Sequence, residues 1–259
     1  MAKKPARATA VDARHDYAAR LVALADQLGA RADLDDVTLR LGAKAAKVRL
    51  ERAASNAFPE PLQALYAAHD GLHFAWQERG TRVPGGGREH VFGRLRLLPL
   101  LDGYSGGWGG TLGFSGEPSE DPDISWYHGF ANGLRALDAP EPEEVTRLVC
   151  FAPFRRPKAK GKAVVEVTRL WWFDSKGPKF PLALDAASYL EEALVACGID
   201  GWQCLFADFE AMPASEHELR YVVVDKAERV LGHLHRLFAD RSWDEHEARV
   251  RKLREQVGS

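Results

Sequence analysis

Residues 58–76, FPEPLQALYAAHDGLHFAW, constrain the fold more than any other stretch of this chain. Pro59 and Pro61 stand where the first turn of a helix has no use for a backbone N–H, and apolar residues then recur at helical spacing. Gly71 supplies the left-handed conformation that ends a helix, and the apolar residues after it alternate with small or polar ones. The stretch therefore predicts a helix that leads through a glycine turn into a strand packed on that helix.

Periodicity predicts further helices on both sides of a sheet-forming middle. Expected helices cover residues 11–28 (ended by Gly29), 43–57, 185–198 and a long region from residue 215, with a charged last helix at 243–257 that either docks on the protein or faces a partner. Expected strands are residues 37–41, 72–77, 90–97, 112–114, 124–128, 148–154, 164–167 and 170–174.

Three segments of the chain resemble motifs of the SUKH superfamily, the Smi/Knr group named after a yeast cell-wall regulator. Residues 58–71 are similar to its helix with an "LP…l..ly…nG" pattern, in which Phe58 and Pro59 stand for the leucine-proline pair. Residues 95–106, LRLLPLLDGYSG, resemble its strand with an "l.pl.e" ending, and residues 185–198 resemble its closing helix. The resemblance spans about residues 45–209, with a glycine-rich insert and flanking helices as departures from the family pattern.

The expected fold class is α+β, with a mixed or antiparallel sheet backed by helices in the SUKH manner and extra helices at both ends. We expect three segments: a tail, helix and short strand at 1–42, a SUKH-like domain at 43–210 and a helical extension at 211–259. With 46% hydrophobic and 28% charged residues, the chain has enough apolar material for a sizeable core.

Charge and hydropathy limit the location and the partners. The net charge of −2 argues against a surface wholly attracted to nucleic acid, so we do not expect nucleic-acid binding. No apolar run approaches the about 18–20 residues of a membrane helix, and the N-terminal residues hold no apolar stretch of a signal peptide. We therefore expect a cytoplasmic protein that contacts no membrane. Its three cysteines, Cys150, Cys197 and Cys204, lie among apolar neighbours and are predicted to be buried thiols.

The candidate partner-binding site is an acidic and aromatic segment. Eight carboxylates, Asp138 among them, stand between residues 117 and 144 against one basic residue, Arg135. Such a run is commonly a solvated loop, but in an inhibitor it also attracts a basic partner surface. The neighbouring aromatic side chains are of the types that anchor interfaces, although they also suit a core. The candidate site residues are Trp108, Glu117, Glu120, Asp121, Asp123, Trp126 and Tyr127.

No stretch of the sequence has the pattern of a catalytic, cofactor or metal site. The serine at 115 lacks a complete G-x-S-x-G setting, the glycines at 106–110 lack a phosphate-binding lysine, and no histidines have zinc-ligand spacing. The basic run at residues 155–162 is interpreted as a hairpin tip whose charge discourages edge pairing.

The resemblance implies a non-catalytic cytoplasmic binding protein. Bacterial SUKH-like proteins are typically immunity proteins that neutralise a cognate toxin, often a nuclease. An intracellular regulatory scaffold, with the C-terminal helices as its partner surface, is the alternative. A third hypothesis is an enzyme acting on glycans or nucleotides through carboxylates such as Glu120 and Asp123, but no paired acid and base stand in a recognisable setting.

Overall fold

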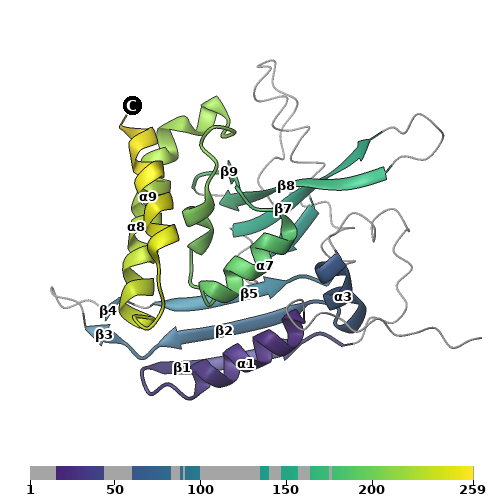
Figure 1. Cartoon of the computed structure of the whole chain (residues 1–259), viewed down its shortest axis with the longest axis vertical. Helices are drawn as coiled ribbons and strands as arrows, with labels where there is room; N and C mark the ends of the chain where they lie inside the picture. The colour runs from purple at the N-terminus through teal and green to yellow at the C-terminus, as the bar shows by residue number, and fades with distance from the viewer. Residues whose placement is uncertain are drawn as a thin grey trace, which may run out of the picture.

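The alternating residues in the middle of the chain form an antiparallel sheet (Figure 1). The computed structural model describes residues 16–43, 60–82, 88–89, 91–99, 135–139, 147–156, 164–174 and 177–258. The described strands of the main sheet lie in the order β1 (Leu34–Leu41), β2 (Leu72–Glu78), β5 (Phe92–Leu97), β6 (Arg135–Asp138), β7 (Arg147–Arg156), β8 (Val164–Asp174) and β9 (Phe180–Pro181). A small hairpin pairs β3 (Thr81–Arg82) with β4 (Arg88–Glu89).

Helices cover one face of this sheet, which confirms the predicted α+β class. They are α1 (Tyr17–Gly29), α3 (Glu60–Ala68), α7 (Ala186–Val195), the 3-10 helices η2 (Trp202–Phe206) and η3 (Ala214–Leu219), α8 (Arg220–Leu237) and α9 (Asp244–Val257). In Figure 1, α1 lies along β1, while α8 and α9 stand side by side and cross the strand direction near the small hairpin.

Capping residues set the starts of two helices. The Asp16 carboxylate accepts a hydrogen bond from the Ala19 N–H at 3.0 Å and starts α1. Asp185 caps α7 in the same way, accepting from the Ser188 N–H at 2.7 Å. The described part of the predicted first helix and the predicted closing helix at 185–198 are therefore confirmed, with α7 ending at Val195.

The predicted glycine turn between the helix and the strand of residues 58–76 is present. It lies a few residues beyond the end of the helix. The helix α3 ends at Ala68, and Gly71 takes a φ of 84° before β2 begins. A Cβ on Gly71 would lie 2.7 Å from the Leu97 carbonyl oxygen, so both the backbone conformation and the close approach require glycine.

One strand prediction was wrong. Residues 164–167 and 170–174 were expected to be separate strands, but they form the single strand β8. The register with β7 passes from the pair Phe151 and Leu170 to the pair Pro153 and Val167, so two residues of β8 face one residue of β7. This bulge interrupts the alternation without ending the pairing, which is why the pattern looked like a break between strands.

The two adjacent tryptophans of β8 lie on opposite faces of the sheet. The Trp172 ring stacks on Phe180 with centroids 6.4 Å apart and belongs to the core beneath α7. Trp171 lies 6.5 Å from Phe173 on the other face, where both are buried.

One hydrophobic core joins all three predicted segments. It runs from Tyr17 on α1 through Phe74 and Tyr189 to Leu253 on α9. β1 from the first segment pairs with β2, and α8 packs against η2. The predicted strands at 112–114 and 124–128, and residues 44–57 of a predicted helix, lie outside the described residues.

Candidate functional site

A cluster of positive charge lies on the face of β1, β2 and β5 that points away from the helices. Arg40 on β1 stands opposite His73 on β2, and His73 stands opposite Arg96 on β5. One step along, Ala75 stands opposite Arg94. We call this surface the basic face; its residues are Thr38, Arg40, His73, Ala75, Gln77, Phe92, Arg94 and Arg96.

Alternation along each strand separates the basic face from the core. The residues between those of the basic face, such as Leu39, Phe74 and Leu95, point into the core under the helices. On the opposite side, Arg40 and Arg94 are exposed, and His73 is partly buried. The strand sequences therefore fold into a surface whose inner side is apolar and whose outer side is cationic.

The electrostatics of the basic face favour an anion. The pKa of His73 is lowered, first by partial burial and then by the positive charges of Arg96, Arg40 and Arg94. Within the described part of the chain, no carboxylate forms an ion pair with these three arginines. At the end of the face, the Asp36 carboxylate accepts a hydrogen bond from the Gln77 side-chain amide. The positive charge of Arg96 also acts on Asp138, where burial raises the pKa and Arg96 opposes that rise.

The one phenyl ring of the basic face is covered by a guanidinium. The Arg94 guanidinium carbon lies 4.8 Å from the centre of the Phe92 ring, within the range of a cation–π contact. This contact holds the Arg94 side chain along the face. It also covers one side of the ring against a stacking nucleic-acid base.

The site residues predicted from the sequence cannot be compared with the basic face. Trp108, Glu117, Glu120, Asp121, Asp123, Trp126 and Tyr127 all lie in the stretch 100–134, outside the described residues. The proposal that they bind a partner stays a prediction.

Sequence reasoning missed the basic face, although a signal was present. The run GRLRL at residues 93–97 alternates arginine with leucine, which marks a strand with one charged side. Arg40 and His73 lie far from it in sequence, and only the strand register places all of them together.

The structure corrects the placement of Asp138, one of the carboxylates of the acidic run. It was counted among eight solvent-facing carboxylates, but its side chain is fully buried. It accepts hydrogen bonds from the Tyr189 hydroxyl at 2.5 Å and from the Arg96 N–H at 2.8 Å. Burial raises the pKa of Asp138 to about 6, against the lowering effect of these hydrogen bonds. This carboxyl group therefore belongs to the polar interior of the fold.

The cysteines are buried free thiols, as predicted. Burial raises the pKa of Cys204 to about 12 and that of Cys150 further. Cys197 also has a raised pKa despite the Arg241 guanidinium 3.3 Å from its Sγ. None of these thiols has the lowered pKa of a reactive cysteine.

A pocket beside α9 combines charges of both signs. It measures about 260 Å³ and lies between α9 and the segment around Phe209. Lys252 and Glu210 both line it, and their charged groups lie 3.8 Å apart. Among the described residues, no group of three or more His, Cys, Asp and Glu side chains is placed to hold a metal ion.

Comparison of the chain with protein-family models, curated proteins and solved structures finds no match. Within the described ranges, no helix combines the length and the apolar character needed to cross a bilayer.

Proposed function

We propose that this chain is a non-catalytic binding protein whose basic face docks on an acidic surface of a partner protein. The observation that carries the proposal is the set Arg40, Arg94 and Arg96 around His73, with no described carboxylate paired to the arginines. After burial, the positive charges of Arg96, Arg40 and Arg94 are the next cause of the lowered pKa of His73, so the cluster repels further positive charge. An acidic partner would relieve this repulsion and gain attraction from a partly desolvated cluster.

A protein partner fits the basic face better than a nucleic acid. Proteins that bind single strands generally offer aromatic side chains on which successive bases stack. On this face, Phe92 is the one phenyl ring, and the Arg94 guanidinium already lies on it. Arginines without a stacking surface suit carboxylates, which they bind through paired hydrogen bonds.

The resemblance to SUKH motifs supports a specific form of this proposal. It favours an immunity protein, in which the acidic partner surface belongs to a cognate toxin and docking neutralises that toxin. A cytoplasmic location belongs to the same proposal. The regulatory scaffold is the alternative, in which the same face holds a signalling partner.

Charge reversal on the basic face tests the proposal. The double variant Arg94→Glu/Arg96→Glu changes the net charge by four units, and Arg251→Glu/Lys252→Glu on exposed positions of α9 changes it equally. Tagged wild type and both variants are expressed in the producing organism, captured partners are identified by mass spectrometry, and the affinity for the purified partner is measured. We expect the first variant to weaken binding at least about tenfold and the control to bind as wild type does.

Circular dichroism first confirms that both variants are folded. A stoichiometric partner that binds Arg94→Glu/Arg96→Glu with wild-type affinity at low salt would show that the basic face is not the docking site. The identity of the partner separates the two roles, because a toxin supports immunity and a signalling protein supports the scaffold.

A further inference from the structure

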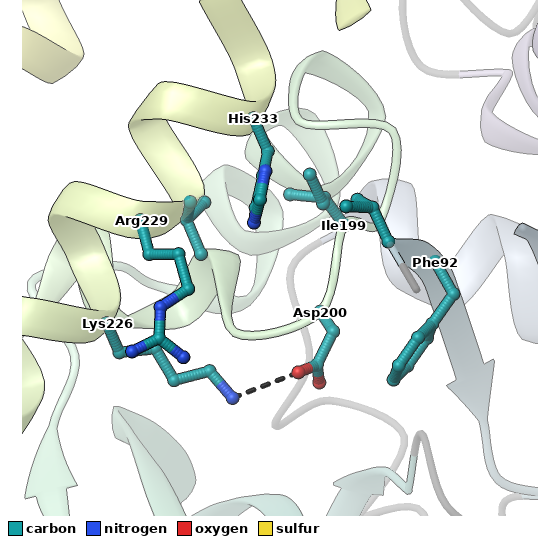
Figure 2. Close-up of a pocket in the computed structure, with 8 residues that line it drawn as sticks. Phe92, Ile199, Asp200, Lys226, Arg229 and His233 are labelled. Atoms are coloured by element: carbon teal, nitrogen blue, oxygen red, sulfur yellow. Dashed lines mark hydrogen bonds and ion pairs between the residues drawn. The ribbon is translucent and has the colours of Figure 1, made fainter. Parts of the chain in front are cut away.

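A pocket lies between α8 and the N-terminal end of β5, at the turn formed by residues 199–200 (Figure 2). Its volume is about 230 Å³. This is below the about 300–1,000 Å³ of pockets that bury drug-sized ligands, so the pocket suits a smaller molecule.

One wall of the pocket is rich in nitrogen donors. Lys226, Arg229 and His233 are spaced by three and four residues along α8, which places them on one side of the helix. Figure 2 shows all three reaching from α8 toward the turn that carries Ile199 and Asp200.

The single carboxylate of the pocket is already neutralised. The Asp200 carboxylate accepts from the Lys226 ammonium at 2.9 Å and from the Arg147 guanidinium at 3.2 Å. Arg147 is itself held by Asp174 at 3.2 Å. Asp200 therefore positions Lys226, whose ammonium keeps two further N–H groups for a ligand.

Arg229 supplies a second cation at the rim. Its side chain is exposed, and no carboxylate of the described chain forms an ion pair with it. The remaining surface of the pocket is mainly apolar and is made by Val91, Phe92, Ile199 and Val230.

We infer that this pocket binds a small phosphate monoester whose organic part is apolar. Lysine and arginine on successive turns of one helix direct several donors at one point, which suits the three oxygens of a phosphate dianion better than the two of a carboxylate. The apolar side takes the ester group, because burying it removes apolar surface from water. The pocket shares Phe92 with the basic face, but its cations lie on α8 and those of the basic face lie on the strands, so variants of Arg229 and of Arg94 and Arg96 test the two proposals independently.

Phenyl phosphate is the probe, because it has one phosphate and one small apolar ring. A titration is followed through the backbone amide resonances of the ¹⁵N-labelled full chain, with inorganic phosphate and benzyl alcohol as partial probes. We expect phenyl phosphate to shift the resonances of Val91, Phe92, Ile199 and Asp200 and to bind at least about tenfold more tightly than either partial probe. Arg229→Ala should weaken binding about tenfold or more, Arg229→Lys should restore part of it, and Arg251→Ala should leave it unchanged.

Circular dichroism shows whether Arg229→Ala is folded, which we expect because position 229 is exposed and alanine favours helix. Binding of phenyl phosphate no tighter than that of inorganic phosphate would overturn the inference. So would shifts at other sites, or equal binding by wild type and a folded Arg229→Ala.

Discussion

At the scale of single residues, Asp138 is an acid that the fold keeps in its interior. The carboxyl group lies under α7, where the Tyr189 hydroxyl reaches it and the Gln203 amide donates to that hydroxyl at 3.1 Å. Because burial disfavours the charged form, its pKa is raised from 3.8 to about 6. A raised pKa means that the folded state binds the proton more tightly than the unfolded chain does.

This linkage predicts the direction in which stability changes with pH. The stabilising contribution of Asp138 is fully present below pH 3.8 and is lost as the pH rises through about 6. The shift of about two pKa units corresponds to about 3 kcal/mol. Asp138→Asn should therefore gain up to about 3 kcal/mol of unfolding free energy relative to wild type between pH 4 and pH 7, as measured by urea denaturation across that range.

Tyr189→Phe serves as the matched variant. It removes the hydrogen bond that lowers the pKa of Asp138, so the loss of stability should move to higher pH. Parallel stability-against-pH curves for wild type and Asp138→Asn would contradict this account of the buried acid.

At the scale of elements, the sequence predicted the features that a few neighbouring residues decide, such as helix caps and turns. Asp185 marks the start of a predicted helix because a cap is decided within a few residues, and Gly71 marks a predicted turn for the same reason. The cap at Asp16 was not predicted, because the expected first helix covered residues 11–28. The bulge in β8 is invisible locally because the partner strand sustains it. Whether a carboxylate such as Asp138 faces solvent or core likewise depends on what packs over it, so sequence alone placed it wrongly.

The sequence left open whether the C-terminal helices dock on the rest of the protein or bind a partner. α8 buries an apolar stripe formed by Val223, Val224, Ala227, Val230, Leu234 and Leu237, and α9 adds Val250 and Leu253. Trp243, just before α9, donates to the Phe238 carbonyl at 3.1 Å and is buried. Burying a valine or leucine side chain contributes about 1.5–3 kcal/mol, so the valines and leucines of the two helices together contribute as much as the about 5–15 kcal/mol of a typical domain's net stability.

Truncation after Ala211 should therefore abolish cooperative unfolding. Loss of a sigmoidal thermal transition by circular dichroism and of a dispersed proton spectrum is the expected result. Truncation after Gln256 is the control, because Val257 is 40% exposed and its removal should cost little. A chain ending at Ala211 that still melts cooperatively would instead mark the helices as a surface for a partner.

At the scale of the whole molecule, the basic face and the acidic segment predicted from the sequence are the two candidates for the partner-binding role. The basic face is set by the register of β1, β2 and β5, which no local pattern reveals. The acidic and aromatic residues from Trp108 to Tyr127 remain a prediction from composition. The basic face and the acidic segment would attract partners of opposite charge, so a single map of the docked complex distinguishes them.

Hydrogen–deuterium exchange of the chain with and without its captured partner is the most direct test of the proposed docking site. We predict slower exchange within β2 and β5, at residues 72–78 and 92–97, when the partner is bound. Exchange within α7, which lies on the other side of the sheet, should stay unchanged. Protection confined to residues 108–127, with β2 and β5 unaffected, would contradict the basic face as the binding surface and return that role to the acidic segment.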